Sequence, residues 1–128
     1  MASNIQQLIA QRYGVERAAV DVNSVTASVG TSAQIIARQS AGRVALMIVN
    51  LSSNSLYVGP FSDVASTKGY ALSAQGGFLN SEWRSDLVLP SLEWSAVASG
   101  SSSAIMVVEI SIDEASDLQQ KKRQLKTL

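Results

Sequence analysis

Runs of apolar residues separated by short polar turns dominate the middle of the chain. In the stretch "VALMIVNLSSNSLYVG", which begins at Val44, the apolar residues are unbroken as far as Val49. Such a run predicts a strand over Arg43–Asn50 that is buried on both faces. Serine and asparagine follow, and these residues favour a tight turn. We therefore expect residues 56–58 to form the second strand of a hairpin with the first. The proline of "GP" should end this second strand.

Shorter strands are predicted on both sides of this hairpin. The segment "AQIIAR", residues 33–38, precedes it, and "YALSAQGGFLNSE" supplies two brief strands about its glycine pair. In "LEWSAVAS" every second position is apolar, which places Leu92, Trp94, Ala96 and Ala98 on one face. Trp94 is therefore expected in the core.

The last predicted strand is "AIMVVEISI", residues 104–112. Its alternation places four apolar residues on one face, and Glu109 and Ser111 on the other beside two further apolar residues. We expect a half-buried strand whose outer face becomes solvent-exposed near its end. The four apolar residues of the first face are Met106, Val108, Ile110 and Ile112.

The spacing of these strands, with no helical pattern between them, predicts an all-β fold, a small antiparallel β-sandwich or barrel. The two ends of the chain have a different pattern. Ile5, Leu8 and Ile9 recur at helical spacing, so a short amphipathic helix is predicted over residues 4–13. We expect an N-terminal arm over 1–23, a β-sandwich domain over 24–112 and a C-terminal tail over 113–128.

The tail, "DEASDLQQKKRQLKTL", has acidic residues first and basic residues last, an order that suits a helix dipole. Leu118, Leu125 and Leu128 provide its apolar positions, so an amphipathic helical or extended tail is predicted. A helix of this length is marginal alone in water and needs a partner surface or the domain to order it. The basic run about Lys122 is interpreted as a solvated helix face.

Composition narrows the function classes. Apolar residues make up 46% of the 128 residues, which permits a packed core, and ten basic residues balance ten acidic ones. A neutral chain is a poor general nucleic-acid binder, because such proteins need a basic surface. No apolar run is long enough to span a membrane, and the N-terminus lacks the pattern of a secretion signal. We therefore expect neither nucleic acid nor membrane as a partner.

The candidate chemistry is sparse, because the chain contains neither histidine nor cysteine. This composition removes imidazole bases, thiol nucleophiles and thiolate metal sites together. The acidic pairs Asp113-Glu114 and Glu82/Asp86 are interpreted as a solvated turn or a helix start. Asp63 or Asp86 could touch calcium, but no alternating acidic loop surrounds either residue. We expect no catalytic residue, metal or cofactor, and no enzymatic activity.

Trp83 lies in the polar setting "NSEWRSD" and is the better tryptophan candidate for a contact surface. Its neighbour Arg84 shares that setting. Aromatic side chains can also stack on sugars, so a carbohydrate-binding module using Trp83 with Tyr57 or Tyr70 is one alternative function.

Several segments together resemble small virion proteins of tailed bacteriophages. They are "RVALMIVN" with its turn and "LYVG", then "STKGYAL", "EWSAVASG" and "AIMVVEI". The match covers about half of the chain, from Arg43 to Ile112, and its motifs are short strands with turns. The resemblance implies an all-β structural module of a virion. It does not choose between capsid decoration, head-fibre and tail proteins, and both ends of the chain lie outside it.

The resulting hypothesis is a capsid decoration (cement) protein on the virion surface, made in the host cytoplasm. It would bridge major capsid protein subunits and self-associate, with a homotrimer favoured. A head-fibre base or tail adaptor is the alternative within virions. The expected contact surface combines the two arms with the tryptophan segment: Ile5, Leu8, Ile9, Tyr13, Trp83, Arg84, Leu118, Lys122, Leu125 and Leu128.

Overall fold

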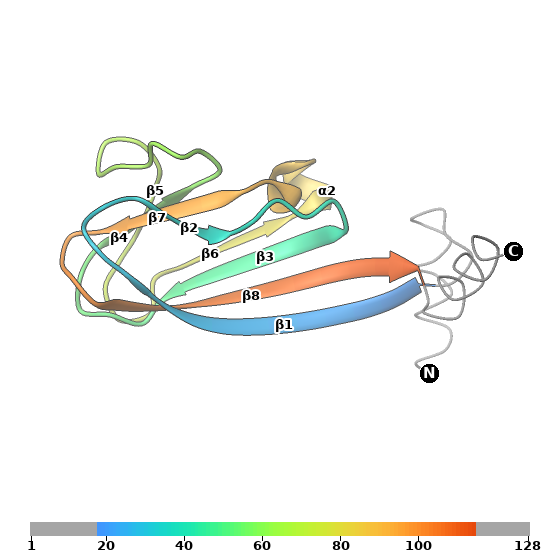
Figure 1. Ribbon diagram of the computed structural model, residues 1–128, viewed down its shortest axis with the longest axis horizontal. Helices are drawn as coiled ribbons and strands as arrows, with labels where there is room; N and C mark the ends of the chain where they lie inside the picture. Colours follow the sequence, from blue (N-terminus) through green and yellow to red (C-terminus); the bar gives the residue numbers. More distant parts are fainter. Residues whose placement is uncertain (1–17, 115–128) are drawn as a thin grey trace, which may run out of the picture. The chain divides into compact units, whose positions relative to one another are not determined.

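The computed structural model describes residues 18–114, which form eight strands, one short helix and one 3-10 turn (Figure 1). In chain order the elements are β1 (Ala18–Val29), β2 (Gln34–Ala37), β3 (Arg43–Asn50), β4 (Leu56–Gly59), β5 (Tyr70–Leu72), β6 (Phe78–Glu82), α2 (Trp83–Asp86), η1 (Leu89–Ser91), β7 (Trp94–Ala98) and β8 (Ser103–Glu114).

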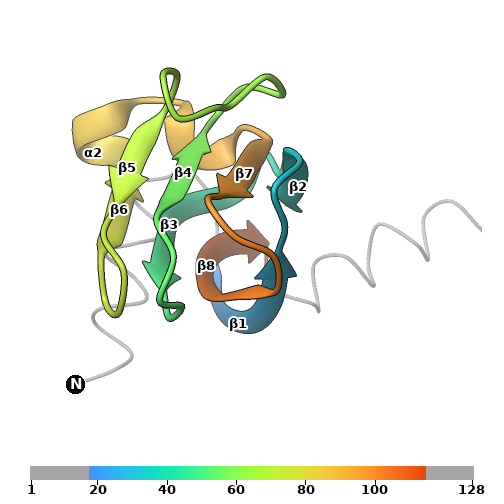
Figure 2. The same ribbon diagram turned by 90° about the vertical axis from the view of Figure 1, so that its left-hand side faces the viewer.

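The strands form two four-stranded antiparallel sheets, so the predicted all-β fold is confirmed. Sheet A has the order β1-β8-β3-β6, and sheet B has the order β2-β7-β4-β5. Figure 2 looks along the strands and shows the two layers. The predicted strands at 33–38 and on either side of the glycine pair are present as β2, β5 and β6.

The predicted hairpin between β3 and β4 is wrong, because the two strands lie in different sheets. In sheet A, β3 pairs with β6, and Ile48 lies opposite Leu79. In sheet B, β4 pairs with β5 and β7, and Val58 lies opposite Ala96 in β7. The serine and asparagine turn is therefore a corner that carries the chain from one sheet to the other.

Asn50 builds this corner, and its side chain is fully buried. Its Nδ2 donates to the carbonyl oxygens of Asn54 at 2.8 Å, Ser73 at 3.1 Å and Leu72 at 3.2 Å. Its Oδ1 accepts from the backbone N–H of Ser52 at 3.0 Å and from the Ser52 hydroxyl at 2.7 Å. One amide thus satisfies backbone groups of the turn at Ser52 and Asn54 and of the distant residues Leu72 and Ser73.

The core lies between the sheets and consists of alternate residues of the central strands. Trp94 is buried as predicted, and its indole N–H donates to the Leu89 carbonyl at 2.8 Å. Leu79 and Leu89 pack against the core from β6 and η1. The fully buried side chains around Trp94 include Leu46, Ile48, Leu56, Val58, Ala96 and Ile105.

Two burial predictions are wrong for one face of sheet A. In β8 the core side chains are Ile105 and Val107, so the predicted outer side of the strand faces the core. Met106, Val108 and Ile110 lie on the other face and are half-buried. The expectation that β3 is buried on both faces fails in the same way, because its alternate residues are also only half-buried.

Arg43 explains why the polar end of β8 can face inward. The Arg43 side chain is 2% exposed, and its Nη1 lies 2.7 Å from the carboxylate of Glu109. Its Nε donates to the carbonyl of Pro90 at 2.7 Å, and its Nη2 donates to the carbonyl of Leu92 at 2.6 Å. Nη1 also donates to the Arg38 carbonyl at 2.9 Å. A partner for both charge and hydrogen bonds makes the burial of Glu109 tolerable.

The ends of the sheets differ from the expected arms. β1 begins at Ala18, within the range 1–23 assigned to the N-terminal arm, and β8 continues to Glu114, within the range 113–128 assigned to the tail. No strand was predicted over β1, and η1 was not expected. α2 lies at the Glu82/Asp86 pair, which was interpreted as a solvated turn or a helix start. The helix predicted over 4–13 and the tail beyond residue 114 lie outside the described residues.

Candidate functional site: the outer face of sheet A

The register of β3 and β6 shows which side chains point away from the core. Met47 pairs with Asn80 and Val49 with Phe78, whereas the intervening pair of Ile48 and Leu79 points inward. Phe78 is 65% exposed, an unusual position for a phenylalanine in a small domain. In β8, Met106, Val108 and Ile110 lie opposite the core face.

These side chains form what we call the outer apolar face of sheet A. It crosses three neighbouring strands, since the sheet order places β8 beside β3 and β3 beside β6. Polar residues border it at β6, where Asn80 and Glu82 are exposed. An apolar centre with a polar rim is the pattern of protein–protein interfaces, in which methionine is enriched. The face comprises Met47, Val49, Phe78, Met106, Val108 and Ile110.

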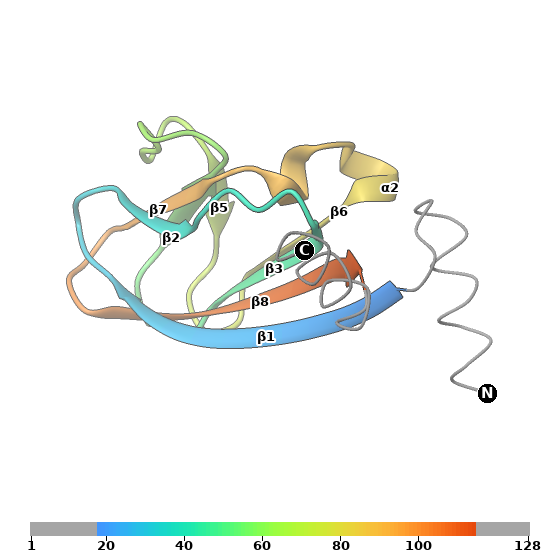
Figure 3. The ribbon, with the colours of Figure 1, turned by 45° about the vertical axis from the view of Figure 1, so that its right-hand side comes forward.

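The second apolar feature is the segment that follows β6, shown beyond β6 in Figure 3. Of the predicted contact residues, Trp83 is half-buried and Arg84 exposed, both in α2. Leu87 and Val88 are more exposed than either, at 77% and 65%. Leu87 also has a φ of 60°, a conformation that costs energy for a side chain of this kind.

Asp86 holds this segment in place. Its Oδ2 accepts from the Ser81 hydroxyl and from the backbone N–H of Glu82, both at 3.0 Å. The backbone N–H of Leu87 donates to the Trp83 carbonyl at 3.0 Å. Asp86 therefore fixes the junction between β6 and α2.

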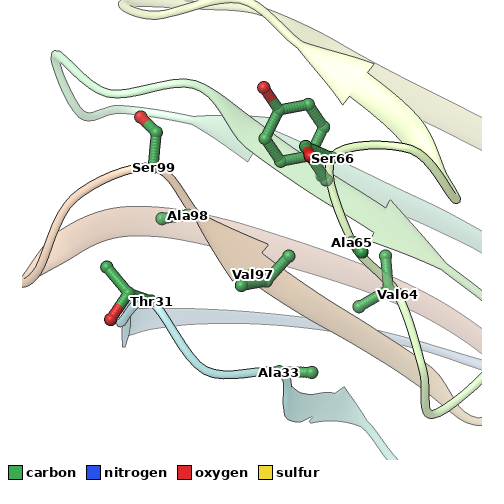
Figure 4. A pocket seen from close by; sticks show the side chains of 9 residues that line it. Thr31, Ala33, Val64, Ala65, Ser66, Val97, Ala98 and Ser99 are labelled. Atoms are coloured by element: carbon green, nitrogen blue, oxygen red, sulfur yellow. The ribbon is translucent and has the colours of Figure 1, made fainter.

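A hollow of about 470 Å³ opens on the outer face of sheet B, beneath the segment that joins β4 to β5 (Figure 4). Tyr57 from β4 and Val97 from β7 line it from the sheet. Its polar groups are hydroxyls, and it contains no acidic or basic side chain. The lining residues are Thr31, Ala33, Tyr57, Val64, Ala65, Ser66, Val97, Ala98 and Ser99.

The segment beside this hollow is braced by Lys68. Its ammonium donates to the Asp63 carboxylate at 2.6 Å and lies 4.9 Å from the centre of the Phe61 ring. The hydrogen bond from Lys68 lowers the pKa of Asp63. Paired backbone hydrogen bonds between Ala65 and Lys68 close the turn.

The aromatic residues proposed for sugar binding have different surroundings in the described residues. Tyr57 lines the hollow, whereas Trp83 is not among its lining residues. Tyr70 stacks on Trp94, with ring centroids 6.2 Å apart. Carbohydrate binding by Trp83 with either tyrosine therefore stays a prediction.

The described part of the chain contains no group of three or more acidic residues able to hold a metal ion. Every buried side-chain nitrogen or oxygen in residues 22–112 has a hydrogen-bond partner, so none is left directed at a ligand. Within the described range, no helix is long and apolar enough to cross a bilayer.

The outer apolar face contains none of the ten predicted contact residues, and Trp83 and Arg84 are the two that the structure describes. Eight of the ten predicted contact residues, in the two arms, lie outside the described residues. Sequence reasoning missed Phe78, Leu87 and Val88. The unbroken apolar run in β3 and the doubly apolar pattern of β8 were the signals that a second face of sheet A is apolar.

No protein-family model matches the chain, and no curated protein matches it either. Among solved structures, a chain from work entitled "Bacillus endospore appendages form a novel family of disulfide-linked pili" is similar in arrangement. It is 14% identical, with a TM-score of 0.46, over 73% of this chain and 88% of that chain. A likeness at this level does not extend to function.

Proposed function

We propose that the protein is a non-enzymatic structural protein of a tailed-phage virion, a capsid decoration protein that bridges neighbouring major capsid protein subunits. The observation that carries the proposal is the outer apolar face of sheet A. Sheet B covers the opposite face of sheet A, and Phe78 on the outer side is 65% exposed. Contiguous apolar surface of this kind marks a binding site for another protein.

The surface chemistry supports binding rather than catalysis. The outer apolar face carries two methionines, whose flexible side chains adapt to a partner surface. The exposed pair Leu87 and Val88 offers a second apolar contact at the end of β6. Two separate contact regions on one small domain suit a protein that touches more than one neighbour.

On a repeated lattice, several modest contacts together give strong overall binding. Interfaces of standard size bury roughly 800 Å² on each partner, and a small domain offers little more than one such area on a face. When copies bind at symmetry-related positions and also contact each other, the effective concentration for each further contact rises. Modest individual interfaces then give a stable coat.

The proposal is tested with the full chain and capsids that lack it. Wild-type protein should co-sediment with capsids, and cryo-electron microscopy should show density over the capsid surface. Phe78→Lys places a charge in the outer apolar face and should weaken binding at least tenfold. Ile35→Lys is the matched control, because Ile35 is 45% exposed in β2 of sheet B.

Three results would overturn the proposal. Density confined to the tail, or a copy number far below that of the capsid subunits, would favour a tail adaptor or head-fibre base. Equal weakening by Phe78→Lys and Ile35→Lys would show that the outer apolar face is not the contact. Circular dichroism should show both variants folded, because Phe78 and Ile35 are 65% and 45% exposed.

A further inference from the structure

The two sheets present four edge strands: β1 and β6 in sheet A, β2 and β5 in sheet B. An edge carries unpaired backbone groups that can pair with another strand, and folded proteins block most edges with short strands, bulges or charges. β2 has only four residues and an irregular register between Ile35 and Ala37. β5 has only three residues. Neither edge offers a long template.

The remaining short edge, β6, is closed at its end. It has five residues and finishes at Glu82, whose backbone N–H is occupied by the Asp86 carboxylate at 3.0 Å. Glu82 also places a charge at this edge. Three of the four edges therefore carry a recognised device against strand pairing.

Residues 22–29 of β1 have none of these devices, and the one charged residue of β1, Asp21, precedes them. β1 is twelve residues long, and "VNSVTASV", residues 22–29, contains no charge, proline or glycine. Residues 22–26 are exposed without a break, including Val22 at 63% and Val25 at 47%. Its valine and threonine content favours extended backbone. Among residues 18–114, its one neighbour in sheet A is β8.

One end of this edge is already occupied by Gln34. The Gln34 Nε2 donates to the Ser28 carbonyl at 2.9 Å, and its Oε1 accepts from the backbone N–H of Gly30 at 3.3 Å. The Ser28 carbonyl therefore points to the free edge. Backbone groups alternate along a strand, so those of Thr26, Ser24 and Val22 point to the same edge.

We propose that this edge pairs with β1 of a second copy of the chain, antiparallel and centred on Ser24. Ser24 then faces its own copy, and Val22 faces Thr26. All three residues direct backbone groups to the shared edge, so they form hydrogen-bonded pairs. The arrangement is two-fold and self-complementary.

The chemistry of the segment selects this occupant over a charged or proline-containing peptide. Because residues 22–29 carry no charge, the two-fold axis brings no like charges together. On the inner side of the strand, Asn23 would face Val25, and both are exposed in one copy. Pairing would cover side chains that a single copy leaves in water.

The pairing has a geometric consequence. A two-fold axis within an antiparallel pair is perpendicular to the sheet, so sheet A continues from one copy into the next. Both outer apolar faces then lie on the same side. This inference does not depend on which assembly the protein serves, and it gives a closed dimer where the sequence favours a homotrimer.

Sedimentation of the full chain over a concentration series tests the proposal, with Ser24→Lys and Ser24→Glu as variants. Wild type should have twice the mass of one chain. Each variant alone should be monomeric, because like charges would meet at the axis. An equimolar mixture of the two should recover the dimer mass. Ser53→Lys, in the exposed corner between the sheets, is the matched control and should remain dimeric.

A monomeric or trimeric wild type would overturn the proposal, as would charge variants that keep the wild-type mass. A mixture that stays monomeric would show that Ser24 does not face its copy. Amide hydrogen exchange provides a second measurement that does not rely on the variants. The N–H groups of Ser24 and Thr26 should exchange more slowly as the wild-type concentration rises, and no change would also contradict the pairing.

Discussion

Arg43 and Glu109 are 66 residues apart in the chain, yet their charged groups lie 2.7 Å apart inside the β-sandwich. The same guanidinium binds the carbonyl of Pro90 in η1 and the carbonyl of Leu92 between η1 and β7. It therefore joins sheet A to the segment that enters sheet B. Asn23 adds a longer hydrogen bond of 3.4 Å to Glu109 from β1.

Arg43→Met should lower the free energy of unfolding by about 3 kcal/mol, the lower end for breaking a buried pair, because Glu109 is 23% exposed. The loss comes from an unpaired carboxylate and carbonyl groups left without a donor. Chemical denaturation measures it. Arg38→Met is the control, since Arg38 is exposed, and it should change stability by less than about 0.5 kcal/mol.

Asn50→Leu keeps a similar volume but removes the amide that closes the corner between β3 and β4. Several buried backbone groups lose their partner, and each such loss costs about 1 to 3 kcal/mol. We expect the midpoint of urea unfolding to fall sharply. Ser53→Ala in the same corner should leave it unchanged, because Ser53 is exposed. Equal effects of the two changes would show that Asn50 is not the organising residue.

Gly69→Ala should destabilise the fold, by about 1 to 3 kcal/mol for a strained backbone. Gly69 has a φ of 142°, and an added Cβ would lie 2.8 Å from the Val58 carbonyl oxygen. Gly30→Ala is the matched comparison, because an added Cβ there meets nothing within 4 Å. A thermal melt of both variants decides the matter, and similar melting temperatures would contradict this reading.

The pKa of Asp63 should lie below its ordinary value, because Lys68 donates a hydrogen bond to the carboxylate. The stabilisation from this pair is present above the unfolded-state pKa of Asp63. It is lost as the pH falls through the lower folded-state pKa. Lys68→Met should raise the pKa of Asp63 towards its ordinary value, which a carboxyl NMR titration would detect. An unchanged titration would exclude Lys68 as the cause.

Deletion of the tail tests its role in assembly. Because β8 continues to Glu114, the deletion should begin at residue 115 and not at Asp113. The shortened chain should unfold cooperatively while associating with its assembly more weakly. Loss of the cooperative transition would show that the tail belongs to the fold. Removing residues 113–128 is the comparison. This longer deletion also shortens β8, so it should lower the stability of the β-sandwich, whereas the deletion from residue 115 should not.

The strands from Arg43 onward were predictable because their apolar runs are strong and their turns are rich in serine, asparagine and glycine. β1 was not, because its valines are mixed with serine, threonine and asparagine without a clean alternation. Its extended conformation depends on β8, which lies far along the chain. Local pattern carries no information about such a partner.

The assignment of strands to sheets also required distant contacts. The corner at Asn50 depends on the carbonyl groups of Leu72 and Ser73, more than twenty residues away. Which face of β8 packs on the core depends on Arg43, because its ion pair with Glu109 stabilises a glutamate on the inward face. The sequence showed that Met106, Val108 and Ile110 share a face. Residue spacing could not show that this face points away from the core, because that depends on the distant residue Arg43.

The position of β8 between β1 and β3 affects how the protein can form during synthesis. The ribosome releases β1 and β3 early, but neither can join sheet A beside its central neighbour until β8 has emerged. Folding is therefore a late event that follows translation of most of the chain, and strand pairings of such sequence separation form slowly. Until then the uncharged residues 22–29 of β1 have two open sides, and chaperones that shield nascent strands should influence the yield of folded protein.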